Sequence, residues 1–175
     1  MGQRTRNLTL SALFIALSVI SLYIASVWPT GLLGLVAVAS LFVAATVIEV
    51  STAFGFYVYI ISSVLGVLIL PNIAAPLLYI FFFGYYPVVK SLIEHLKSVV
   101  MQWALKLFVF IASLTIIWFL FKDLIFNFGE NPPHIILIYL GGSVVFSIFD
   151  YGYTKLIWFY INRISKNMKG NRDKR

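Results

Sequence analysis

Residues 32–70 have the sequence LLGLVAVASLFVAATVIEVSTAFGFYVYIISSVLGVLIL, in which Glu49 is the single charged residue. As one α-helix this stretch would be about 58 Å long at 1.5 Å per residue, whereas the hydrocarbon core of a bilayer is about 30 Å thick. The stretch must therefore fold back on itself. Polar and small residues between Glu49 and Gly55 mark the turn, which predicts two membrane-spanning helices near residues 32–48 and 53–70.

Four further apolar segments flank this pair, and each approaches the roughly 20 residues that a transmembrane helix needs. They cover residues 8–27, 74–89, 99–120 and 135–160. The stretch KSLIEHLK at 90–97 is polar on one side and apolar on the other, which predicts a segment at the membrane interface. We therefore expect an all-α, polytopic integral membrane protein. Residues 1–161 form a single compact bundle of six transmembrane helices, and residues 162–175 form a basic tail.

The composition indicates that lipid is the solvent of this chain. Of the 175 residues, 61% are hydrophobic and 11% are charged, compared with about 25% charged residues in a typical soluble domain. The mean hydropathy is +0.97. These values exclude a soluble enzyme, a nucleic-acid-binding module and a secreted scaffold. The absence of cysteine also removes disulfides, thiolate metal sites and cysteine nucleophiles.

The distribution of basic residues predicts the orientation of the chain. Ten basic residues fall in the segments proposed to be cytoplasmic, and Lys122 alone falls in a proposed outer loop. The ten are Arg4, Arg6, Lys90, Lys97 and the six lysines and arginines between Arg163 and Arg175. This is a positive-inside pattern, so both termini are expected in the cytoplasm. The basic tail then lies beside anionic lipid, and we expect no nucleic-acid partner.

The reactive residue types are too few for most catalytic sites. His95 and His134 are the two histidines of the chain, and the expected topology places them on opposite sides of the membrane. The sequence has no H-E-x-x-H motif, no paired carboxylates and no nucleotide-binding loop. We therefore predict that the chain is not an enzyme and that it holds no cofactor and no metal.

Five ionisable residues inside the expected spans form a candidate charge cluster. From their positions along the helices they all fall in the cytoplasmic third of the membrane, where two acids and three bases can pair across helices. They are Glu49, Lys90, Lys106, Asp150 and Lys155. Two interpretations stay open: structural ion pairs with snorkelling lysines, or a charged site that couples to a partner or carries protons.

The outer loops supply a second candidate site. Their stacking and hydrogen-bonding side chains could close over a small solute, although ordinary interfacial polarity explains the same residues. The candidate substrate-binding residues are Trp28, Thr30, Asn72, Asn127, Glu130, Asn131 and His134.

Small residues on the first span form a candidate interface. Ala12 and Ala16 are four residues apart and therefore share one helical face. Such faces let helices approach closely in lipid, where packing drives association. Packing within the bundle and contact with another subunit both remain open for this pair.

The segment LTLSALFIAL at 8–17, on a compact six-span chain with a short basic N-terminus, resembles the first helix of the substrate-binding S-components of energy-coupling factor transporters. In that family an alanine-x-x-x-alanine motif docks onto the transmembrane coupling subunit, and here it maps onto Ala12 and Ala16. The resemblance implies capture of a vitamin or metal ion from outside a bacterial inner membrane, driven by ATPase subunits on other chains. The histidine-led N-terminus of metal-specific members is missing, because this chain begins Met1-Gly2-Gln3-Arg4.

Two other functions stay open. The chain is also similar in layout to the membrane scaffold of bacterial rod-shape morphogenesis, which would bind protein partners and no small molecule. A lipid or cell-envelope transporter working alone is the third candidate. Many such folds need two repeats, and this chain provides one, so a lone transporter would have to dimerise.

Overall fold

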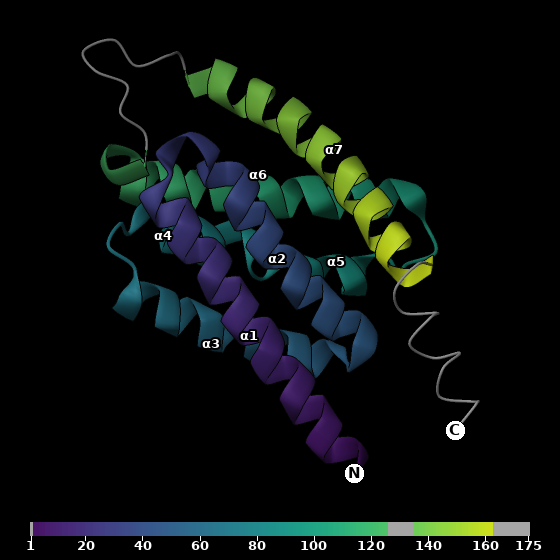
Figure 1. Cartoon of the computed structure of the whole chain (residues 1–175). Coiled ribbons are helices and arrows are strands. Elements are labelled where there is room, and N and C mark those ends of the chain that lie inside the picture. The colour runs from purple at the N-terminus through teal and green to yellow at the C-terminus, as the bar shows by residue number, and fades with distance from the viewer. Residues whose placement is uncertain (1, 126–134, 163–175) are drawn as a thin grey trace.

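The fold is seen in a computed structural model that describes residues 2–125 and 135–162 (Figure 1). Every regular element in these two ranges is a helix. In chain order the elements are α1 (Gln3–Val27), the 3₁₀ turn η1 (Pro29–Gly31), α2 (Leu32–Glu49), α3 (Thr52–Ile69), α4 (Ala74–Leu78), the π-helical turn η2 (Tyr79–Phe83), α5 (Tyr86–Ile93), α6 (Val99–Ile125) and α7 (Ile135–Tyr160).

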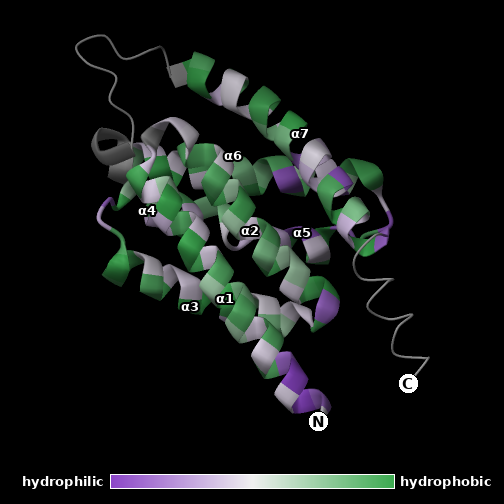
Figure 2. Ribbon diagram, in the orientation of Figure 1, coloured by the Kyte–Doolittle hydropathy of each residue, from purple (hydrophilic) through white to green (hydrophobic). Residues whose placement is uncertain are grey.

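Six helices in the described residues are long and apolar enough to cross a bilayer. They are α1, α2, α3, the stretch Ala74–Ile93 that joins α4, η2 and α5, and the long helices α6 and α7. Figure 2 shows hydrophobic residues along all of them, with hydrophilic residues gathered at the N-terminal end of α1 and near the helix ends. The predicted all-α fold is confirmed, and the six apolar helices suggest a multi-pass membrane protein.

The sharp turn inside the long apolar stretch lies where the sequence predicted it. Helix α2 ends at Glu49 and α3 begins at Thr52. The side chain of Ser51 caps α3 by accepting a hydrogen bond of 3.4 Å from the backbone N–H of Phe54. A serine at this position satisfies one of the amide groups that the first turn of a helix leaves unpaired.

The segment 90–97 is divided between a helix and a turn. Helix α5 continues to Ile93, and residues 94–98 form turns and bends that lead into α6. The side chain of Lys90 is buried, because it points between the helices toward acidic partners. Lys90 therefore faces the interior of the bundle.

The main core lies between α1, α2 and α3. Leu22, Val36, Val43 and Val58 are completely buried there. Some hydroxyl groups in this core bond to backbone carbonyls, as when Ser18 Oγ of α1 donates to Ala39 O of α2 over 3.2 Å. Buried polar groups need such partners, since an unpaired one costs about 1–3 kcal/mol.

The fourth span is interrupted by a wide turn. In η2 the backbone N–H of Gly84 donates to Tyr79 O over 2.7 Å, five residues back instead of four. Pro87 follows at the start of α5, where a residue without an N–H is tolerated. This turn brings the backbone at Gly84 close to Tyr59 of α3 and to Tyr79.

Replacing Gly84 with alanine should destabilise the fold. The new Cβ atom would lie 2.6 Å from Tyr59 Cδ2 and 2.8 Å from Tyr79 O, which are both too close. We expect Gly84→Ala to cost about 1–3 kcal/mol, as overpacking does elsewhere, and to lower the Tm in detergent.

Gly141→Ala in α7 is the matched control, because its Cβ would meet nothing within 4 Å. Equal Tm values for the two variants would contradict the close approach at Gly84.

Candidate functional site

Four charged side chains form a closed ring of ion pairs between α5, α6 and α7. Lys90 Nζ lies 2.8 Å from Glu94 Oε1 and also pairs with Asp150 Oδ1. Lys106 Nζ lies 2.8 Å from the same Glu94 oxygen and 3.0 Å from Asp150 Oδ2. Each lysine therefore touches both acids, and we call these four residues the ion-pair ring.

Helical spacing aligns the groups of the ring with their hydrogen-bond partners. Tyr86, Lys90 and Glu94 are four residues apart and share one side of the chain at α5. The Tyr86 hydroxyl donates to Asp150 Oδ1 over 2.5 Å. Lys90 Nζ also donates to Thr154 Oγ1 over 2.9 Å, one turn beyond Asp150 in α7. The buried acid thus receives three donors from two helices.

The charges of the ring balance, which makes its burial possible. The side chains of Lys90 and Asp150 are 2% and 3% exposed, whereas that of Glu94 is 40% exposed. Partial burial pushes the pKa of Glu94 up, but its hydrogen bonds to Lys106 and Lys90 outweigh this effect and hold the pKa below its ordinary value. Glu94 is therefore ionised at neutral pH, and two positive charges face two negative ones.

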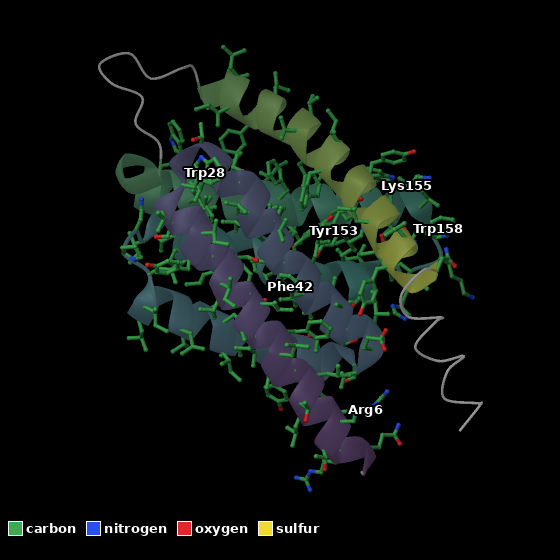
Figure 3. All side chains as sticks on the ribbon, viewed as in Figure 1. Arg6, Trp28, Phe42, Tyr153, Lys155 and Trp158 are labelled. Carbon is green, nitrogen blue, oxygen red and sulfur yellow. The ribbon has the colours of Figure 1, made fainter. Side chains whose placement is uncertain are left out.

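The structure brings together three of the five residues that the sequence suggested as a charge cluster. Lys90, Lys106 and Asp150 belong to the ring. Glu49 is buried at the end of α2, and its Oε1 has no hydrogen-bond partner within the described residues. Lys155 is exposed on α7, with Nζ 5.4 Å from the centre of the Tyr151 ring (Figure 3).

Glu94 is the ring residue that the sequence analysis missed. It was placed in an interfacial segment, apart from the charges in the spans. The signal that identifies it is its spacing of four from Lys90, which places the two side chains on one helical face.

An aromatic layer covers the ion-pair ring on the side that faces the beginning of α7. Its members are Phe82, Tyr86, Phe110, Phe146 and Phe149. The rings of Phe110 and Phe146 are stacked with their centroids 4.7 Å apart. The ring centroids of Tyr86 and Phe82 are 5.1 Å apart. Tyr86 belongs to both arrangements, since its ring packs in this layer while its hydroxyl bonds to Asp150.

A cavity of about 400 Å³ lies on the other side of the aromatic layer, between α2, α6 and α7. Its lining is apolar apart from Ser113, whose hydroxyl is already bonded to Tyr85 OH at 2.5 Å and to Val109 O at 2.7 Å. The lining residues are Leu33, Gly34, Ala37, Leu78, Phe82, Phe83, Phe110, Ser113, Leu114, Ile117, Ile138, Gly142, Val145, Phe146 and Phe149. A volume of this size is typical of small-molecule sites.

Three of the outer-loop residues suggested as a binding site are described, and none of these three lines this cavity. Trp28 and Thr30 are exposed beyond the end of α1, where Figure 3 labels Trp28. Asn72 stabilises a turn, because its Oδ1 accepts from Ala74 N at 2.8 Å and its own N–H donates to Ser26 Oγ at 2.8 Å. The other four candidates lie outside the described residues: Asn127, Glu130, Asn131 and His134.

Small residues that face each other across helices are the sequence signal for the cavity. Gly34 and Ala37 of α2 and Gly142 of α7 all contribute to its lining. None of these three was among the predicted site residues.

Ala12 and Ala16 lie on the outward face of α1. Both are exposed, whereas their neighbours Ser11 and Phe14 are buried against the bundle. The small face is therefore open to another molecule and does not serve packing within this chain.

The described residues contain no group of three histidine, aspartate or glutamate side chains placed to hold a metal ion. The cavity lining adds no free nucleophile or base, since its one hydroxyl is already paired. What these residues can do is bind an apolar group by shape and hold the helices around it.

Removing one acid from the ion-pair ring should destabilise the protein strongly. Asp150→Asn leaves two buried lysines sharing one carboxylate, and breaking a buried pair in this way costs about 3–5 kcal/mol. We expect a large fall in Tm in detergent. The double variant Lys106→Met/Asp150→Asn restores charge balance and should recover most of the loss.

Lys155→Met serves as the control for removing a lysine from outside the ring. The prediction is contradicted if Asp150→Asn alone has the same Tm as this control or as the balanced double variant. The ring would then not hold the helices together.

Family models, curated proteins and solved structures were compared with this chain, and none of them matches it. Its function is therefore inferred from its own residues: the ion-pair ring, the aromatic layer, the apolar cavity and the exposed alanine face.

Proposed function

We propose that this chain is a membrane-embedded subunit that captures a small solute and delivers it to partner chains that power its uptake. The observation that carries the proposal is the cavity of about 400 Å³ between α2, α6 and α7. It is framed by three helices and closed at one end by the aromatic layer. In this proposal the protein lies in a bacterial inner membrane with both termini in the cytoplasm.

The chemistry of the chain supports binding without catalysis. The described lining of the cavity offers hydrocarbon and aromatic surface, and the charges of the ion-pair ring are paired with one another. The sequence contains no nucleotide-binding loop, so energy for uptake would come from ATPase subunits on other chains.

The exposed face of α1 supports a partner helix. Ala12 and Ala16 leave a shallow surface on which the helix of a transmembrane coupling subunit can pack closely. This arrangement follows the S-component resemblance. A morphogenesis scaffold could use the same face, so the identity of the partner separates the two functions.

Filling the cavity should abolish capture. A Cβ atom at Gly34 meets nothing within 4 Å, so Gly34→Phe can extend into the open space without a backbone clash. Native mass spectrometry of gently purified protein should show a small molecule that is lost on denaturation. We expect the occupied fraction to fall at least about tenfold in Gly34→Phe, which corresponds to about 1.4 kcal/mol of binding free energy.

Gly141→Phe is the matched control, because Gly141 is equally open but lies outside the cavity lining. Wild-type protein that carries no small molecule, or a Gly34→Phe variant that retains it, would overturn solute capture in this cavity.

Placing larger side chains on the small face of α1 should break the contact with the coupling subunit. In the variant Ala12→Leu/Ala16→Leu the added side chains hold a partner helix away, so co-purification of coupling and ATPase subunits from native cells should be lost. Ala104→Leu, a single exposed alanine on α6, should leave it intact. Co-purification of cell-wall synthesis proteins in place of ATPases would support the scaffold.

A further inference from the structure

The cavity opens sideways between two helices. Its floor is buried, since Phe82, Ile117 and Phe146 are each less than 10% exposed. The residues at its opening are exposed: Leu33 of α2 by 58% and Val145 of α7 by 63%. Figure 1 shows α7 lying diagonally across the top of the bundle, on the side where α2 faces it. We call the gap flanked by Leu33 and Val145 the lateral opening.

The surface around the lateral opening is apolar. Val38 of α2 and Val144 and Ile148 of α7 are all exposed beside it. Val145 is the eleventh residue of α7, and at 1.5 Å per residue it lies about 15 Å from the beginning of that helix. The opening therefore reaches the middle of an apolar helix that is long enough to cross a bilayer. The α7 side of the opening therefore faces the hydrocarbon region, whereas its α2 side begins at Leu33, the second residue of that helix.

Polar ties hold the ends of α7 and leave the lateral opening free. Near its beginning, Tyr139 OH lies 2.8 Å from Thr115 Oγ1 of α6. Toward its end, Tyr153 OH donates to Ser40 O of α2 over 3.0 Å, close to the ion-pair ring. Between these points no hydrogen bond or ion pair joins the described side chains of α7 to α2, so access through the opening breaks none of them.

The lining of the cavity selects against polar solutes. Its one hydroxyl, on Ser113, is already bonded to Tyr85 and to Val109. Each polar group of a solute would lose its hydrogen bonds to water without replacement, at a cost of about 1–3 kcal/mol per group. A hydrocarbon chain pays no such penalty and gains dispersion contacts with the aromatic floor.

The length of the cavity favours a chain over a compact ring system. Along α7 its lining runs from Ile138 to Phe149, a rise of about 16 Å at 1.5 Å per residue. At the Phe149 end the aromatic layer closes it, and Asp150 of the ion-pair ring follows immediately.

We infer that the solute carries an acyl chain, which inserts into the cavity from the lipid through the lateral opening. This inference rests on the proposed function, because it names the chemical class of the solute for the same cavity. The bound chain lies along α7 with its end against the aromatic layer.

Fluorescence quenching tests this inference directly, since the natural chain has no cysteine to interfere. Val145→Cys and Ile148→Cys are each labelled with bimane in phosphatidylcholine vesicles and titrated with stearic acid that carries a nitroxide on its chain. The two side chains are similarly exposed, at 63% and 68%, but only Val145 lines the cavity. At position 145 we expect quenching that saturates as the nitroxide-labelled stearic acid is added. At position 148 we expect quenching that rises only in proportion to the concentration of that probe.

Two further variants check the site and the route. Gly34→Phe should remove the saturable component at position 145 and leave the proportional component. Leu33→Trp narrows the lateral opening without touching the floor, and should slow the approach to saturation relative to Ile148→Trp. Equal, proportional quenching at positions 145 and 148 would mean bulk lipid alone and would overturn the inference.

The failures of the two proposals are distinguishable. If quenching is proportional at both positions while native mass spectrometry detects a solute that Gly34→Phe removes, solute capture stands and the acyl-chain inference fails. If neither experiment detects occupancy of the cavity, both proposals fail.

Discussion

A buried charge must be paired, and the packing of the last three spans depends on this constraint. Lys90, Lys106 and Asp150 come from three different segments and lie in the interior. Taking any one of them out of water alone costs several kcal/mol, so their burial requires the helices to meet where the charges do. Apolar packing in lipid has little directional preference of its own. The ion-pair ring supplies this directional preference, because it fixes how far α5, α6 and α7 are shifted along their axes relative to one another.

The aromatic layer and the cavity are built outward from the ion-pair ring. Tyr86 connects the ring to the aromatic layer, because it donates to Asp150 and packs on Phe82 and Phe146. The aromatic layer in turn forms the floor of the cavity. Polar, aromatic and aliphatic surfaces thus follow one another along α7, and a molecule in the cavity is separated from the charges by rings alone. A change at the ring would shift the floor of the cavity, although the two share no polar contact.

Much of the fold followed from the sequence, because it depends on length and polarity along one chain. The apolar run at 32–70 exceeds the bilayer thickness, so its turn near Glu49 was predictable. The positions of Lys90, Lys106 and Asp150 along the expected spans suggested that they lie at a common level. Which of the charges meet did not follow, because pairing also depends on the direction in which each side chain points around its helix. Glu49 shares their expected depth and stands apart from the ring.

The cavity could not be located from the sequence for the same reason, whereas the spacing of four between Lys90 and Glu94 does identify Glu94 as a ring member. A cavity between helices arises where small residues on different spans face each other, and the sequence does not state which faces meet. The outer-loop candidates were chosen for their polarity. Asn72 shows that such polarity can serve the chain itself, since its amide oxygen accepts from Ala74 N and completes a turn.

The wide turn at η2 sets the direction around the helix axis in which the side chains after it in the fourth span point. A π-turn accommodates one residue more than a regular helical turn, and each residue of an α-helix advances the chain by about 100° around the axis. Closing this turn into regular winding with all of its residues kept would rotate Lys90 by about that angle, away from α7. The same rotation would carry Tyr86 out of the aromatic layer. One unfavourable turn therefore sets the direction in which Tyr86 and Lys90 point, toward the aromatic layer and Asp150.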